Sequence, residues 1–267
     1  MRNKKFSVIT INYNNADGLR ATMESVLNQT CRDLEYIVID GGSTDGSVEV
    51  IRSYADRLSY WVSEPDKGVY HAMNKGIAQA QGEYLNFMNS GDCFHSLQVL
   101  EQVTGELQEC DILLGRYCNR ETGEVKAVRR GEMTLLALLK EPFNHQSMFY
   151  RRTLFASRLY DETLRIQSDF KFNLLSIVFD GCRVAFTDAV VADYDFNGIS
   201  SNAELVREER QVVLQQLLPE RVLADYRTLY TPAEVPLVTL LPQLKRYSHI
   251  QHLLYRLARW LIRLKER

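Results

Sequence analysis

An aspartate followed by glycines, at the end of an apolar segment, is the most informative chemical pattern in this sequence. Asp40 follows residues 34–39, a β-branched run short enough to be a buried strand, and a glycine-rich turn then opens a stretch with helical spacing. A carboxylate at a strand end accepts hydrogen bonds from a base or ribose, and glycines such as Gly42 let the backbone approach a ligand closely. A helix-capping role for Ser43 or Asp45 is the alternative interpretation.

Polar and aromatic side chains also follow the first β-rich run, residues 6–11. Thr10 lies near the end of this run and Asn12 and Tyr13 come directly after it, so we expect them to hold a base by hydrogen bonding and stacking. Neither strand is followed by the G-x-G-x-x-G fingerprint or by a G-x-x-x-x-G-K-[ST] phosphate loop. A bound nucleotide is therefore expected to be held in another way.

The order of the expected elements indicates the fold class. A strand, a polar loop and a helix are followed by a second strand, the Asp40 loop and a second helix, which is typical of nucleotide-binding α/β domains. The same periodicities predict further strands at residues 59–63, 84–88 and 111–117, and helices at 69–81 and 135–139.

Five polar motifs occur in one order along the chain: SVITINYN at 7–14, IDGGSTDG at 39–46, EPDKGVY at 64–70, MNKG at 73–76 and NSGD at 89–92. This order resembles the family 2 glycosyltransferases, in particular the bacterial enzymes of O-antigen and capsule assembly, over roughly residues 5–200. The resemblance implies an α/β protein of the GT-A fold, with a central, mostly parallel sheet flanked by helices. It also implies a nucleotide-sugar donor, a divalent metal (Mn²⁺ or Mg²⁺) and inversion at the anomeric carbon.

The resemblance assigns a donor pocket and a metal site. It places Asp66 and Asn74 in the donor pocket, and it places the metal at the strand end that carries the NSGD motif. A divalent cation there stabilises the charge of the departing nucleoside diphosphate. Asn89 and Gly91 stand where the family usually has aspartates, so Asp92 is the only carboxylate of the motif. Weaker metal binding is therefore predicted, with Asn89 supplying a neutral oxygen or holding a water.

The resemblance also points to a general base. In relatives an acidic residue at the start of an apolar helix takes the proton of the attacking sugar hydroxyl, and the matching position here is Asp169. A single displacement inverts configuration and requires one such base. Asp161 and Glu162 are alternatives, and a purely structural helix-cap role for Asp169 is another. His145 and Gln146 are expected on the acceptor or diphosphate side, with a simple loop hydrogen bond as the alternative.

Bulk composition limits the class of protein. The 267 residues are 45% hydrophobic and carry a formal charge of −2, which gives no general reason to expect a nucleic-acid partner. Five cysteines without a C-x-x-C pair indicate reduced thiols rather than a disulfide framework or a zinc site. No opening signal peptide is recognisable, and no apolar run approaches the ~20 residues that a membrane span needs. We therefore expect a cytoplasmic protein.

The sequence changes character near its C-terminal end. We predict a catalytic domain over residues 1–203 and a helical extension over residues 204–267. Within it, residues 245–267 combine an apolar stripe with basic positions, typical of a helix lying at a membrane interface. Docking on the catalytic core or on a second subunit is the alternative. Upstream, the glycine- and serine-containing loop ending at residue 202 is a candidate lid over the diphosphate.

Three functions remain to be compared. The leading one is an inverting transferase that moves a sugar, most simply from a UDP-sugar, to a hydroxyl of a saccharide or lipid-linked saccharide. A sugar-1-phosphate nucleotidyltransferase would carry a basic loop after the first strand, whereas here no Arg or Lys occurs from Asn12 until Arg20. A binding module that grips a nucleotide sugar without turnover is favoured by the depleted NSGD motif and opposed by Asp169.

Overall fold

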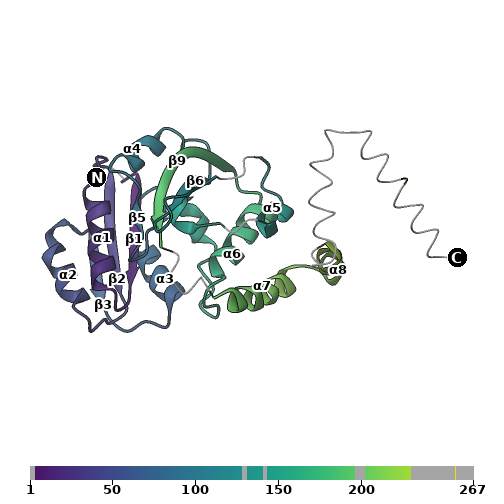
Figure 1. The fold of residues 1–267 in the computed structure, drawn as a ribbon, viewed down its shortest axis with the longest axis horizontal. Helices are drawn as coiled ribbons and strands as arrows, with labels where there is room; N and C mark the ends of the chain where they lie inside the picture. Colours follow the sequence, from purple (N-terminus) through teal and green to yellow (C-terminus); the bar gives the residue numbers. More distant parts are fainter. Residues whose placement is uncertain (1–3, 128–130, 141–142, 196–201, 230–255, 257–267) are drawn as a thin grey trace. The chain divides into compact units, whose positions relative to one another are not determined.

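The computed structural model describes residues 4–127, 131–140, 143–195 and 202–229, together with residue 256. Its centre is a nine-stranded sheet with the order β3-β2-β1-β4-β8-β6-β9-β5, and β7 pairs with β6 (Figure 1). The strands are β1 (Phe6–Asn12), β2 (Leu34–Asp40), β3 (Tyr60–Ser63), β4 (Tyr84–Phe87), β5 (Cys93–Phe94), β6 (Ile112–Asn119), β7 (Val125–Lys126), β8 (Met148–Arg151) and β9 (Val184–Tyr194).

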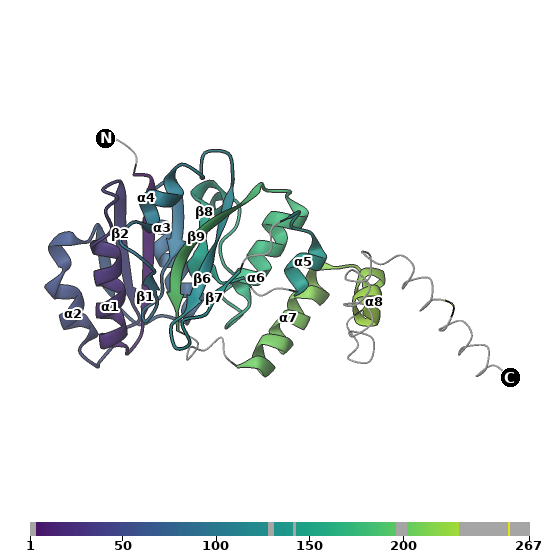
Figure 2. The same cartoon turned by 45° about the horizontal axis from the view of Figure 1, so that its top comes forward.

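Helices flank the sheet and form many of the connections between its strands, and two further helices follow the last strand in the sequence (Figure 2). The α-helices are α1 (Ala16–Leu27), α2 (Ser47–Ser53), α3 (Val69–Gln79), α4 (Val99–Thr104), α5 (Leu135–Lys140), α6 (Ser168–Asn173), α7 (Ala203–Leu217) and α8 (Glu220–Leu229). Short 3₁₀ turns are η1 (Ala55–Arg57), η2 (His145–Ser147) and η3 (Arg152–Ala156), and α6 continues as the π-helix η4 (Leu174–Phe179).

The sheet has a parallel half and a mixed half. The strands β3, β2, β1 and β4 run parallel, so their carboxyl ends meet at one edge. Beyond β4 the strand β8 runs antiparallel to both β4 and β6, whereas β6 and β9 are again parallel. The expected α/β fold with a flanked sheet is confirmed. The parallel character is concentrated in the first half, which carries the strand-end motifs.

Side chains of β1 alternate between the two faces of the sheet, and each face packs against different helices. Phe6 and Val8 of β1 join one core cluster with Leu19 and Met23 of α1, and residues of α2 and α4 complete this cluster. Ile9 points to the opposite face, where it meets α3: a Cβ added at Gly76 would lie 2.4 Å from Ile9 Cγ2. Because both faces are covered, every residue of β1 is buried, as expected for a parallel strand.

A cluster of aromatic rings fixes the helix α6 against the sheet. Phe172 of α6 stacks on Phe155 with 4.4 Å between ring centroids, and both pack against Tyr160 and Tyr150. Phe87 of β4 contacts the same rings edge to face. Such pairs add about 0.5–1.5 kcal/mol each beyond area burial. The start of α6 is therefore held rigidly relative to the end of β4.

The chain divides into two compact units, Met1–Arg210 and Gln211–Arg267. The division falls within α7, and the domain boundary expected after residue 203 stays a prediction. The expected helical character after residue 203 is seen in α7 and α8. The expected lid residues 196–201 and the basic segment 245–267, except for Arg256 in a helical conformation, lie outside the described residues. Within the described chain, no helix has the length and hydrophobicity of a membrane span.

Candidate active site

Three neighbouring strands end in a hydrogen-bonded cluster that we call the nucleoside-side network. The register of the sheet places Asn12 beside Asp40 and Asp40 beside Ser63. The Asp40 carboxylate accepts hydrogen bonds from Asn12 Nδ2 at 2.7 Å, from Ser63 Oγ at 2.6 Å and from Ser43 Oγ at 2.6 Å. The backbone N–H groups of Ser43 and Gly42 also donate to it. Asp40 thus shapes the glycine turn from within.

The electrostatic state of Asp40 follows from these contacts. The residue is fully buried, and burial by itself raises the pKa of a carboxyl group. Hydrogen bonds from Ser43, Ser63 and Asn12 stabilise the charged form more strongly, so the pKa of Asp40 lies below its ordinary value. The carboxylate is therefore ionised and fully engaged by protein donors.

An exposed aromatic ring lies beside this network. Tyr13 is 67% exposed, and a Cβ added at Gly41 would lie 3.2 Å from Tyr13 Cδ2 and 2.5 Å from Asp66 Oδ2. Tyr13, Gly41 and Asp66 therefore converge on one spot at the sheet edge. The next residue, Gly42, has φ +81°, a conformation that favours glycine. An exposed ring, a bare backbone and a carboxylate together suit the recognition of a flat heterocycle.

Two residues expected in the donor pocket have side chains committed elsewhere. The Thr10 hydroxyl lies 2.8 Å from Tyr36 Oη and donates to the backbone oxygen of Met88, within the core. Asn74 donates to the Tyr160 backbone oxygen and to Glu162 Oε1, both at 2.9 Å. The hydroxyl of Thr10 is thus not free to contact a nucleoside. Asn74 instead braces the segment that leads into α6.

The NSGD motif follows β4 directly and forms the second part of the site. Asp92 is 5% exposed; its carboxylate accepts from Gln146 Nε2 at 2.6 Å and from the Asp195 backbone N–H at 2.9 Å. Burial raises the pKa of Asp92 to about 6, although the Asp195 and Gln146 hydrogen bonds and the nearby His145 oppose this shift. Among the described residues, Asn89 Oδ1 is buried and has no hydrogen-bond partner.

The oxygen atoms of this motif fit a hard divalent cation. A buried carboxylate and an unpartnered amide oxygen, Asn89 Oδ1, are the ligand types that Mg²⁺ and Mn²⁺ prefer. Gly91 has φ +103°, so an aspartate at this position would be strained, which gives a physical reason for its absence. Arg120 donates to the Gly91 backbone oxygen at 2.8 Å and brings a positive charge to the motif. We call Asn89, Asp92 and their immediate partners the metal-motif site.

Asp169 lies in the first turn of α6 and connects to the metal-motif site through one imidazole. Its Oδ2 is 3.0 Å from His145 Nδ1, and His145 Nε2 is 3.0 Å from Asn89 Nδ2. Since an amide NH₂ can only donate, His145 Nε2 accepts and the ring proton is on Nδ1, facing Asp169. Tyr70 Oη also donates to Asp169 Oδ1 at 3.0 Å. The expected base and the expected metal residue therefore belong to one hydrogen-bonded site.

The alternative base positions are engaged differently. Asp161 pairs with Lys171 Nζ at 2.6 Å and accepts hydrogen bonds from Thr163. Burial raises the pKa of Asp161, but these contacts lower it by more, so the pKa lies below its ordinary value. Glu162 accepts from Asn74. The helix-capping alternative for Asp169 does not describe the structure, because Gln167 is the N-cap residue of α6. At the start of α2 the N-cap residue is Gly46, and Asp45 just before it accepts hydrogen bonds from the Ser47 N–H and Oγ.

Sequence reasoning missed several residues of the site. Tyr70, Ser63, Arg120 and Asp195 were not expected in it, and periodicity singles out none of them as functional. Tyr70 ends the EPDKGVY motif, so only its motif membership gave a signal. The others come together only through the strand order.

Comparison with known proteins places the chain in a family. The model of the family described as "Glycosyl transferase family 2" matches residues 7–173. The chain belongs to glycosyl transferase family 2. Over 206 residues it is 32% identical to a PGL/p-HBAD biosynthesis glycosyltransferase of Mycobacterium bovis, covering 73% of this chain and 79% of that protein. Membership of this family favours the transferase interpretation over the nucleotidyltransferase alternative.

Solved structures of other glycosyltransferases share the fold. S. aureus TarS (residues 1–349) in complex with UDP superposes with a TM-score of 0.60 at 21% identity, covering 72% of this chain and 60% of that one. Glucosyl-3-phosphoglycerate synthase from Mycobacterium tuberculosis, in complex with Mn²⁺, UDP and glucosyl-3-phosphoglycerate, superposes with a TM-score of 0.56 at 15% identity, covering 79% of each chain. The likeness confirms the expected GT-A fold for this family 2 member.

Proposed function

We propose that this chain is an inverting glycosyltransferase that moves a sugar from a UDP-sugar to a hydroxyl of a saccharide or lipid-linked saccharide, in the assembly of bacterial cell-surface polysaccharide. One observation carries the proposal. Asp169 is joined by His145 to the metal-motif site, so a carboxylate able to take a proton lies within two hydrogen bonds of Asn89. A single displacement needs one such base beside the leaving group.

Each part of the site has a role in the proposed reaction. Tyr13, the backbone at Gly41 and Asp66 receive the nucleoside, on a loop that Asp40 holds in shape. Asn89 and Asp92 would hold a Mn²⁺ or Mg²⁺ ion, which when bound would neutralise the diphosphate. The solved structures of this fold in complex with UDP and with Mn²⁺ support the choice of nucleotide and metal.

Asp169 acts as the base of the proposed reaction. Its carboxylate accepts the proton of the attacking hydroxyl, while Tyr70 and His145 hold it in orientation through the hydrogen bonds described above. Aromatic packing fixes α6, so the carboxylate does not need to reorganise before attack. A cytoplasmic location, with contact to a membrane surface through residues 245–267, would suit a lipid-linked acceptor and is part of the proposal.

Calorimetric titration of UDP, GDP and dTDP into the purified chain tests the proposal. We expect UDP to bind in the presence of Mn²⁺ and to bind more weakly in EDTA, because a bound ion would neutralise the charge of the diphosphate. UDP-sugars tested in the same buffer should then release UDP in the presence of a saccharide acceptor. Binding without any release over a panel of donors and acceptors would favour the binding-module alternative. Absence of nucleotide binding in both buffers would overturn the proposal.

A further inference from the structure

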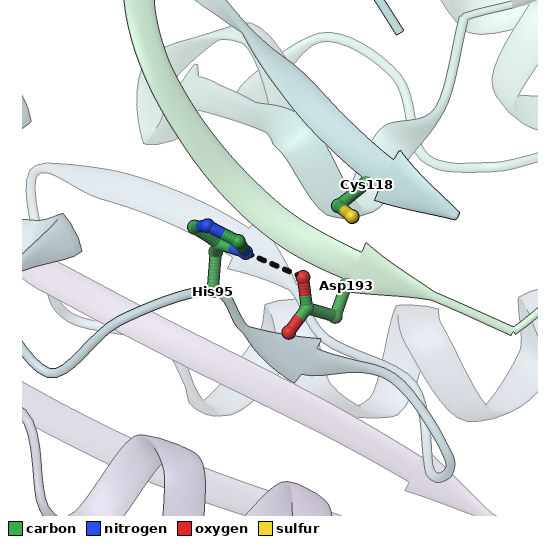
Figure 3. A group of neighbouring side chains, drawn as sticks. All are labelled: His95, Cys118 and Asp193. Atoms are coloured by element: carbon green, nitrogen blue, oxygen red, sulfur yellow. Dashed lines mark hydrogen bonds and ion pairs between the residues drawn. The ribbon is translucent and has the colours of Figure 1, made fainter. Parts of the chain in front are cut away.

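The strands β6 and β9 and the residue that follows β5 bring a cysteine, an aspartate and a histidine together (Figure 3). Cys118 of β6 is the register partner of Asp193 in β9, and Asp193 is in turn the register partner of Cys93 in β5. His95 follows β5, and its backbone N–H donates a hydrogen bond to the backbone oxygen of Val191 in β9. The ligand atoms of His95, Cys118 and Asp193 all lie within 4.8 Å of one another.

These three side chains supply nitrogen, sulfur and oxygen donors, a set that binds zinc and similar ions. In a tetrahedral zinc site the ligand atoms lie about 3.3–3.8 Å apart, as bonds of about 2.0–2.3 Å require. The His95–Asp193 contact is shorter, at 2.6 Å between Nδ1 and Oδ1. A bound ion would replace this hydrogen bond, and the distance between Nδ1 and Oδ1 would increase by about 1 Å. His95 and Asp193 are 40% and 31% exposed in their side chains, so this movement is not restrained by core packing.

The charges of the cluster match a divalent ion. Cys118 is buried, and a thiol must lose its proton to become a metal ligand. On coordination the thiol proton passes to solvent, and the imidazole proton moves from Nδ1 to Nε2. The resulting thiolate and carboxylate carry two negative charges, which neutralise one M²⁺ ion. Three protein ligands leave a fourth position for water.

We propose that His95, Cys118 and Asp193 form a binding site for one zinc-type transition-metal ion, separate from the oxygen-ligated donor-site metal. A thiolate ligand selects Zn²⁺ or Co²⁺ over Mg²⁺ and Mn²⁺, whereas the oxygen atoms of Asn89 and Asp92 favour the harder ions. The ion would cross-link β5, β6 and β9. The spacing of the cysteines does not predict this site, because the three proposed ligands lie far apart in the sequence. This inference is independent of the proposed function.

Cobalt spectroscopy on the intact, metal-free chain tests the site. We expect one Co²⁺ per chain to give a near-ultraviolet thiolate-to-cobalt charge-transfer band, which Zn²⁺ removes and Mg²⁺ does not. Zinc at about 100 times its dissociation constant should also raise the Tm by roughly 5–10 °C. Absence of the charge-transfer band from the intact chain would overturn the proposal.

Matched variants locate the ligands. Cys118→Ser should abolish the band, whereas Cys31→Ser and Cys93→Ser, which remove thiols outside the cluster, should retain it. Asp92→Asn should retain it as well, since that residue belongs to the other site. If Cys118→Ser fails to fold, His95→Gln decides instead, because its half-exposed side chain is not needed for the core; it should weaken Co²⁺ binding at least tenfold. An undiminished band in a folded Cys118→Ser variant, or an unchanged Co²⁺ affinity in His95→Gln, would overturn the proposal.

Discussion

The nucleoside-side network and the metal-motif site both lie at strand ends, but they are built on opposite principles. Asp40 is buried and its carboxylate is fully supplied with donors, so its pKa is lowered. Asp92 is also buried, yet burial outweighs its two hydrogen bonds, and nearby Asn89 Oδ1 has no partner. The fold itself stabilises the charged carboxylate of the first region more than burial opposes it, whereas in the second region burial prevails. Each region also holds a buried amide oxygen without a hydrogen-bond partner among the described residues, Asn12 Oδ1 in the first and Asn89 Oδ1 in the second, as expected where a ligand completes a site.

The largest effect is expected at Asp169, the proposed base. Asp169→Asn keeps the shape of the side chain but removes its ability to accept the proton, so UDP-sugar turnover should fall about 10²- to 10⁴-fold. UDP binding should stay unchanged, since Asp169 does not contact the proposed nucleoside cradle. Steady-state kinetics and calorimetry measure the two quantities. Asp161→Asn, in the segment preceding α6, is the matched control and should retain turnover; equal losses in both variants would contradict the assignment.

Asp92→Asn should separate binding from stability. The substitution removes a buried negative charge whose burial is unfavourable, so the free energy of unfolding should stay constant or rise. The proposed metal ligand is lost at the same time. The affinity for UDP in Mn²⁺ should therefore fall to the value that the unaltered chain shows in EDTA. Calorimetry in both buffers and a thermal melt make the comparison, and a destabilised variant would show that this carboxylate is structural.

Asp40→Asn should give the opposite result. It removes the acceptor of several charge-assisted hydrogen bonds, so we expect a loss of about 2–3 kcal/mol in the free energy of unfolding. Because the folded-state pKa of Asp40 is lowered, its stabilisation is present above the unfolded pKa and is lost as pH falls through the folded pKa. The difference between the two proteins in urea melts should therefore shrink toward acidic pH. A difference independent of pH would mean that charge is not the cause.

Much of this contrast could be predicted from sequence, but not all. The strand-end placement of Asp40 and Asn12, the NSGD motif and the position of Asp169 at a helix start follow from periodicity and motif order. The commitment of Asn74 to the loop at Tyr160 does not, because it joins residues 86 positions apart. Such contacts depend on the insertion of β8 between β4 and β6, which local spacing does not encode.

His145 and the His95–Cys118–Asp193 cluster illustrate the same limit. His145 lies 56 residues from Asn89 and 24 from Asp169, yet its two nitrogens contact both side chains. In the second case β6, β9 and the residue after β5, which are distant in sequence, bring their side chains together. Residue type indicated a site role for His145, whereas the cysteine pattern indicated reduced thiols rather than a zinc site. Only the sheet order showed which groups meet, and so which of them can act together.

The smallest expected effect tests how Asp169 is positioned. Tyr70→Phe removes the hydroxyl that donates to Asp169 Oδ1 and leaves the ring contact with Tyr160 in place. The loss of one such hydrogen bond is worth about 0.5–1.5 kcal/mol, so kcat should fall roughly two- to tenfold. The KM for the donor and the Tm should stay nearly constant, because Tyr70 orients the base without contacting the nucleoside cradle. A fall in Tm with unchanged kcat would instead show that the hydroxyl stabilises the fold and does not orient Asp169.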